Sequence, residues 1–124
     1  MNMPSSHREL FYHVTWSTKY RKPLIVPDVR PMLLSVMRNK ARELGCWPYA
    51  VNVTDDHAHL LLYIPPSITI ARVIREIKGI SAYQLRVRIA GFKWQTGYGI
   101  LSIRRREIPY VKAYIENQEE HHRN

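Results

Sequence analysis

A very short connection between two strand-like segments constrains the fold of this chain more than any other sequence feature. Residues 47–53 and 57–64 have the composition of strands, and only a Thr-Asp-Asp turn separates them. Three residues are too few for a crossover, so the two strands must pair antiparallel as a hairpin. Pro65 and Pro66 end the second strand, because proline cannot donate to the hydrogen bonds of a sheet.

Strand and helix patterns on both sides of the hairpin complete the order of elements. Residues 10–18 alternate apolar side chains as a strand does, and residues 94–103 are predicted to form another strand. Apolar residues recur at helical spacing from Asp28 to Leu44 and from Ile70 towards Arg88. A last helix is expected to begin near Pro109. The predicted order is therefore β-α-β-β-α-β with an additional C-terminal helix.

This order is the ferredoxin-like pattern of α+β proteins, in which helices cover one face of an antiparallel sheet. We expect the other face of the sheet to be free of helices. The 124 residues suffice for one compact domain and are too few for two of ordinary size. A single domain is therefore expected over residues 1–124.

The charge balance indicates a polyanionic partner. The chain has 19 Lys and Arg against 10 Asp and Glu, which gives a net charge of +9. The basic residues occur in groups, often beside aromatic residues, and this combination suits single-stranded nucleic acid, whose phosphates attract cations and whose bases stack on rings. For any one group, an ordinary solvated surface is an equally good interpretation. The predicted DNA contacts are Lys19, Arg21, Lys22, Arg75, Lys78, Arg104 and Arg105.

No apolar run in the sequence approaches the length of a membrane span, and the first residues have no signal-peptide core. We therefore expect a cytoplasmic protein without a membrane partner. The single cysteine, Cys46, agrees with a reducing compartment, and we assign it to packing.

His57 and His59 lie two residues apart in the third predicted strand, so both imidazoles point to the same face. Such a pair supplies half of a metal site, although two polar residues on a solvated face would have the same spacing. The run of three leucines after His59 favours the metal interpretation, because it places the pair at the start of a buried central strand. His13, on the first strand, is assigned to DNA contact or packing.

Tyr114 and Gln118 are four residues apart in the last predicted helix, and residues at this spacing share a face. A nucleophile and a third ligand can be sought here. The spacing alone favours the plainer interpretation, in which Tyr114 lies at the edge of the core and Gln118 is a surface amide. His121 and His122 are interpreted as polar residues near the chain end.

These residues lie in five segments whose order resembles one known family. The segments read HVTWSTKYRKP, VTDDHAHLLLYIPP, IREIKGISAYQL, WQTGYGILSI and VKAYIENQ. They are similar to the first strand, the His-x-His strand, the second helix, the last strand and the tyrosine helix of the single-tyrosine HUH transposases. That family comprises the transposases of the smallest insertion sequences and includes the REP-associated tyrosine transposases.

The resemblance implies a ferredoxin-like or RRM-like fold and a transposase that cleaves and rejoins single-stranded DNA. It further implies that His57, His59 and Gln118 hold Mg²⁺ or Mn²⁺ and that Tyr114 forms a 5′-phosphotyrosine link. The implied partners are DNA hairpins at the ends of the element and a second copy of the chain in a homodimer. In such a dimer the tyrosine helix is able to serve the metal site of the partner subunit.

Three other functions fit parts of the sequence. A non-catalytic RRM-like module that binds single-stranded nucleic acid would have the same charge and fold. An HUH replication initiator or relaxase would share the His pair and a tyrosine. A nucleotide hydrolase with clustered histidines is disfavoured, because the position that would carry a third alternate histidine is Leu61.

Overall fold

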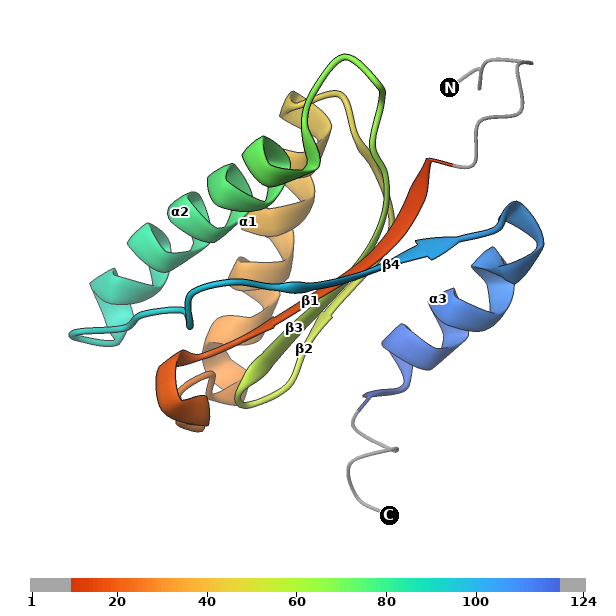
Figure 1. Ribbon diagram of the computed structural model, residues 1–124. Coiled ribbons are helices and arrows are strands. Elements are labelled where there is room, and N and C mark those ends of the chain that lie inside the picture. Colours follow the sequence, from red (N-terminus) through yellow and green to blue (C-terminus); the bar gives the residue numbers. More distant parts are fainter. Residues whose placement is uncertain (1–9, 119–124) are drawn as a thin grey trace.

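The computed structural model describes residues 10–118. Its four strands form one antiparallel sheet in the order β2-β3-β1-β4 (Figure 1). The predicted order of elements and the α+β fold are confirmed, while His121 and His122 lie outside the described residues. The strands are β1 (Phe11–Ser17), β2 (Trp47–Val53), β3 (His57–Tyr63) and β4 (Gly99–Ile103); the helices are α1 (Arg30–Glu43), α2 (Ile70–Arg88) and α3 (Ile108–Glu116); the 3₁₀ turns are η1 (Lys19–Arg21), η2 (Pro27–Val29) and η3 (Arg105–Glu107).

The main core lies between the sheet and a layer formed by α1 and α2, which cover the same face (Figure 1). Ala58, Leu60 and Leu62 of β3 are fully buried in this core. Truncating a buried leucine to alanine costs about 2–5 kcal/mol, so this burial fixes the register of β3. The period of the strand then sends His57 and His59 to the opposite face.

Helix α3 covers part of that opposite face, so the expectation that it would be free of helices is wrong (Figure 1). Ile115 is fully buried in a second apolar cluster, together with Phe11 of β1 and Leu61 of β3. Helical spacing of apolar residues shows that a helix has a buried side, but not which face of a sheet receives it.

Strand β4 is shorter than predicted, because it begins at Gly99 instead of Trp94. Trp94 forms only an isolated bridge to Thr18. Gly97 has a φ of 90°, a left-handed conformation that interrupts an extended strand. Residues 94–98 therefore form a loop beside the end of β1. None of the helices within residues 10–118 is long and apolar enough to cross a membrane.

Candidate metal and nucleic-acid site

His57 and His59 project from β3 to the face that α3 partly covers. Their rings are stacked, with centroids 6.0 Å apart and an interplanar angle of 27°. Both side chains are half-buried, whereas Ala58 between them is fully buried on the other face. The pair is therefore neither part of the main core nor fully solvated.

Asp56, the last residue of the turn before β3, contacts the first imidazole. Its Oδ1 lies 2.8 Å from Nδ1 of His57. Burial raises the pKa of Asp56, but the hydrogen bond and charge of His57, the charge of Arg21 and the hydrogen bond from Thr54 together lower it below its usual value. The carboxylate is therefore ionised at neutral pH and accepts a hydrogen bond from Nδ1–H of the ring.

Arg21 approaches the other nitrogen of the same ring. Its Nη2 lies 3.4 Å from Nε2 of His57, and its Nε lies 3.8 Å from Oδ2 of Asp56. Arg21 and the preceding Tyr20 both have positive φ angles, 54° and 60°. Two consecutive residues in this sparsely populated conformation turn the chain sharply after β1 and bring the guanidinium next to His57.

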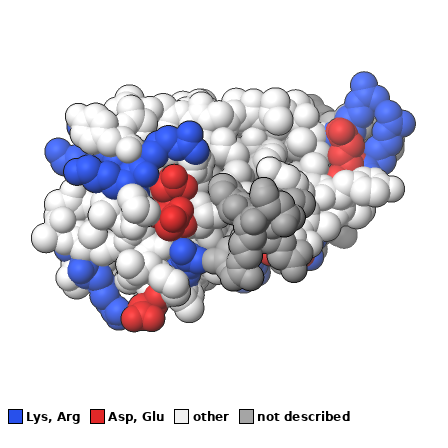
Figure 2. Space-filling model, turned by 90° about the horizontal axis from the view of Figure 1, so that it is seen from below, with Lys and Arg blue, Asp and Glu red and all other residues white. Residues whose placement is uncertain are grey.

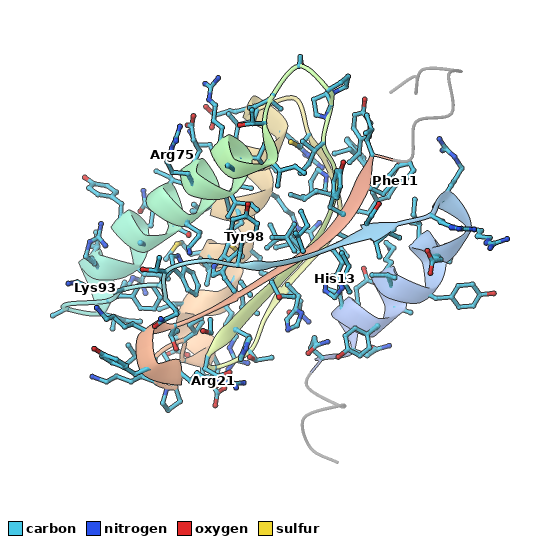
Figure 3. All side chains as sticks on the ribbon, in the orientation of Figure 1. Phe11, His13, Arg21, Arg75, Lys93 and Tyr98 are labelled. Atoms are coloured by element: carbon cyan, nitrogen blue, oxygen red, sulfur yellow. The ribbon has the colours of Figure 1, made fainter. Side chains whose placement is uncertain are left out.

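His13 of β1 contacts the second imidazole, a role that the sequence analysis did not assign. Nε2 of His13 lies 3.4 Å from Nδ1 of His59, and burial lowers the pKa of His13. The ring of His13 also meets the ring of Tyr114 edge to face, with centroids 6.4 Å apart. Figure 3 shows His13 on the sheet face that α3 partly covers. The alternation of β1 could have indicated this, because His13 shares a face with Phe11 and Thr15.

Asn52 of β2 fixes the C-terminal turn of α3 to the sheet, and nothing in the sequence pointed to it. Its Nδ2 donates to the carbonyl oxygens of Ile115 at 2.8 Å and Glu116 at 3.4 Å. Asn52 lies directly opposite His59 in the β2–β3 register. These two hydrogen bonds therefore hold the C-terminal end of α3 next to His59.

Tyr114 precedes this attachment point in the chain, and Gln118 follows it. Tyr114 is 46% exposed, whereas Gln118 is 1% exposed and lies just beyond the end of α3. Nε2 of Gln118 is 3.5 Å from the carbonyl oxygen of Tyr114, which is the outer limit of a hydrogen bond. The two residues are one turn apart as predicted, but only Tyr114 presents a large part of its side chain to solvent.

The donors that the sequence analysis assigned to a metal ion are the two imidazoles of His57 and His59 and the amide of Gln118. Within residues 10–118, no three His, Cys, Asp or Glu side chains form a group that could hold a metal ion. The amide of Gln118 would have to complete such a site. Neutral imidazole and amide donors suit a divalent cation whose remaining positions are filled by phosphate oxygens and water.

The predicted DNA contacts Lys19, Arg21 and Lys22 lie together in η1 and just after it, at the end of β1 nearest His57. The ammonium groups of Lys19 and Lys22 lie 5.5 Å and 5.9 Å from the ring centroid of Tyr20, which is exposed. An exposed ring flanked by cations is the combination that binds an unstacked base and its phosphates.

Arg104 and Arg105 lie at the opposite end of β1, because Phe11 pairs with Ile103 in the sheet. The guanidinium of Arg105 lies 5.1 Å from the ring centroid of Phe11. In Figure 3, Phe11 and Arg21 mark these two ends of the sheet. Figure 2 shows Lys and Arg in separate groups on the face seen from below, with acidic residues beside them, and not as one continuous patch.

The structure separates Arg75 from Lys78, although both were predicted to contact DNA. Arg75 is exposed on α2. The ammonium group of Lys78 donates to the carbonyl oxygens of Gln95 at 2.8 Å and Gly97 at 2.9 Å, and burial lowers its pKa. Lys78 thus holds the 94–98 loop, with two of its three hydrogen-bond donors engaged.

A small pocket of about 200 Å³ lies between this loop and His57. It is lined by His57, by Thr15 and Ser17 of β1, and by the loop up to Tyr98. A Cβ at Gly99 would lie 2.9 Å from Oγ1 of Thr15, so a side chain there would require Thr15 or the backbone of β4 to shift.

The sequence and fold of this chain match those of several transposases. Residues 6–118 match the model of a protein family described as "Transposase IS200 like". The chain is 30% identical over 118 residues to the ISDra2 transposase TnpA of Deinococcus radiodurans, covering 89% of this chain and 84% of that protein. It is 24% identical over 115 residues to the transposase for insertion sequence element IS200 of Salmonella typhimurium, covering 86% of this chain and 75% of that protein.

Two solved structures have a similar fold. A putative transposase from Deinococcus radiodurans superposes with a TM-score of 0.73 at 29% identity, covering 95% of this chain and 98% of that one. The REP-associated tyrosine transposase bound to a REP hairpin superposes with a TM-score of 0.71 at 17% identity, covering 98% of this chain and 74% of that one.

Proposed function

Since the chain belongs to the IS200-like transposase family, we propose that it cleaves and rejoins single-stranded DNA through a covalent phosphotyrosine intermediate, with Tyr114 as the nucleophile. The observation that carries this proposal is the contact between elements distant in sequence. The ring of Tyr114 on α3 meets His13 on β1, and His13 contacts His59 on β3. The candidate nucleophile is therefore connected through His13 to one of the candidate metal ligands, His59.

The reaction proposed for Tyr114 is a transesterification. The phenolic oxygen attacks the phosphorus of a phosphodiester, so that a bond from tyrosine to phosphorus forms and the bond to the 3′ oxygen breaks. The phenol proton leaves to solvent, and the departing 3′ oxygen takes up a proton. Because the phosphotyrosine remains an ester, a 3′-hydroxyl can later reverse the step without an external energy source. The half-exposed position of Tyr114 suits a group that must reach a bound strand.

His57, His59 and Gln118 are the residues proposed to hold the divalent cation, Mg²⁺ or Mn²⁺. When bound, such an ion neutralises charge on the phosphate oxygens. The donor set fits this role, because Asp56 engages Nδ1 of His57 and His13 contacts Nδ1 of His59. Nε2 of each ring is then the nitrogen proposed to face the metal, and at His57 the guanidinium of Arg21 would have to move away from it.

The proposed DNA contacts on either side of this site are Lys19, Arg21 and Lys22 at one end of β1 and Arg104 and Arg105 at the other. Seven strand residues span about 20 Å, so the two basic groups would bracket the scissile phosphate. One candidate nucleophilic tyrosine per chain suggests that two chains act together, which is the basis for proposing a homodimer. The related transposase solved with a REP hairpin supports hairpin-forming single strands as the substrate class.

The test is the substitution Tyr114→Phe, which removes one oxygen and little volume. Fold and DNA binding are expected to survive, while strand cleavage and the covalent protein–DNA complex disappear together. Labelled hairpin oligonucleotides incubated with Mg²⁺ or Mn²⁺ and separated on denaturing gels measure both products.

Tyr110→Phe is the matched control, because Tyr110 lies one turn earlier on α3 and is exposed. This variant should keep the covalent complex. An adduct that persists in the Tyr114 variant would show that another residue attacks. Cleavage without an adduct in either variant would show that water is the nucleophile and that the protein is a nuclease. DNA binding without cleavage in the wild type would favour a non-catalytic binding module.

A further inference from the structure

We propose that Asp56 and His13 are positioning residues for the two candidate metal ligands, each engaging Nδ1 of one imidazole so that Nε2 is the nitrogen presented to a divalent cation. The inference rests on the proposed function, in which His57 and His59 are ligands. It goes further by assigning the protonated nitrogen of each ring and the side chain that keeps the proton there.

For His57, two contacts on opposite sides of the ring assign the same tautomer. The carboxylate of Asp56 can only accept, so its Oδ1 at 2.8 Å requires a proton on Nδ1. The guanidinium of Arg21 can only donate, so its Nη2 at 3.4 Å requires a lone pair on Nε2. A neutral ring with the proton on Nδ1 satisfies both neighbours.

For His59, the corresponding partner is a second imidazole. Nε2 of His13 lies 3.4 Å from Nδ1 of His59, so one nitrogen donates and the other accepts. A ligand role for His59 selects the direction in which His59 donates, because its Nε2 then carries the lone pair. The contact is longer than the 2.8 Å contact of Asp56 and has no carboxylate acceptor, so it should position its ring less strongly.

The assignment matters because an imidazole in water places its proton preferentially on Nε2, the nitrogen that a metal would need. A partner that holds the proton on Nδ1 removes this conflict and limits rotation of the ring. Contacts of this kind commonly change metal affinity by about 10- to 100-fold.

The first experiment reads the tautomers directly. Long-range ¹H–¹⁵N spectra of the metal-free full-length protein distinguish protonated from unprotonated ring nitrogens. We expect Nδ1 to be protonated and Nε2 unprotonated in both His57 and His59. A proton on Nε2 of either ring would overturn the assignment for that ring.

The second experiment measures Mn²⁺ binding by calorimetry in variants whose metal-free melting temperatures match the wild type. Asp56→Ala should weaken binding about 10-fold or more, and His13→Phe should weaken it less. His13→Gln, which restores an acceptor, should recover part of the loss. Asp55→Ala is the matched control, because it removes the same charge from an exposed neighbouring residue.

The outcomes separate this inference from the proposed function. Equal weakening by Asp56→Ala and Asp55→Ala would show a bulk charge effect and overturn the positioning role of Asp56. Unchanged binding in His13→Phe would overturn the role of His13. If the wild type itself binds no Mn²⁺, the metal assignment of the proposed function fails and this inference fails with it.

Discussion

At the residue scale, Arg21 and a divalent cation would compete for Nε2 of His57. The guanidinium is a cation that points at Nε2 of His57 from 3.4 Å, and its side chain is 68% exposed, so it is able to swing away. Bound single-stranded DNA would give Arg21 a phosphate as an alternative partner. The same residue is therefore expected to oppose metal binding in the free protein and to favour DNA binding.

Arg21→Gln should accordingly change two affinities in opposite directions. Without DNA, the Mn²⁺ affinity should rise by at most about 30-fold, because a unit charge and a divalent cation near 4 Å apart in water repel each other by about 2 kcal/mol. Affinity for single-stranded DNA should fall. Calorimetry and fluorescence anisotropy measure the two effects. Lys22→Gln, which removes the same charge beside η1, should lower DNA affinity alone, and an equal rise in Mn²⁺ affinity would argue against a specific role of Arg21.

Cys46 gives a residue-scale prediction outside the site. Burial raises the pKa of its thiol to about 11, so only about one molecule in a thousand carries the thiolate at pH 8. Because the pKa of the thiol is higher in the folded state, the protonated thiol favours folding. This contribution to the free energy of unfolding is complete below the unfolded pKa of about 8.5 and is lost as pH rises towards 11. A disulfide reagent at pH 8 should label the native thiol at least about 100-fold more slowly than the urea-unfolded thiol. Equal rates would contradict this account.

At the scale of elements, the 94–98 loop depends on a lysine from α2. The two hydrogen bonds of Lys78 hold the loop that lines the small pocket beside His57. Lys78→Met should therefore lower the free energy of unfolding by about 1–2 kcal/mol and leave the salt dependence of DNA binding nearly unchanged. Arg75→Met, one turn earlier and exposed, should show the reverse pattern. Urea denaturation and DNA titrations at several salt concentrations measure both, and identical behaviour of the two variants would refute the distinction.

The same loop shows where sequence reasoning reaches its limit. The bounds of β2 match the prediction, because its apolar pattern and the turn after it are local signals. The start of β4 does not match, since the prediction could not include the carbonyl contacts of Lys78, a residue of another element. Asn52 and His13 were missed as parts of the site for the same reason. Asn52 meets α3 from β2, and His13 meets His59 across the β1–β3 pair.

At the scale of the whole molecule, binding and chemistry are assigned to different side chains. Two groups of basic residues lie at the two ends of β1, and the two histidines lie between them. Contacts with phosphates dominate the affinity of proteins for nucleic acids, and each contact to a single strand adds about −0.7 to the slope of log affinity against log salt. Removing the histidines should therefore change cleavage far more than binding.

The double substitution His57→Ala and His59→Ala should reduce cleavage at least about 100-fold, the scale of losing an electrostatic stabiliser of a reacting group. DNA affinity should stay within about threefold of the wild type, and the salt slope should not change.

The double substitution Arg104→Ala and Arg105→Ala is the counterpart of the histidine variant. It should weaken binding and reduce the magnitude of the salt slope by about 1.4, while cleavage of fully bound DNA persists, because both arginines lie at the end of β1 opposite His57. Anisotropy titrations and single-turnover cleavage at saturating protein test both variants. If a correctly folded His57/His59 variant loses DNA binding together with cleavage, the histidines are DNA contacts and not metal ligands.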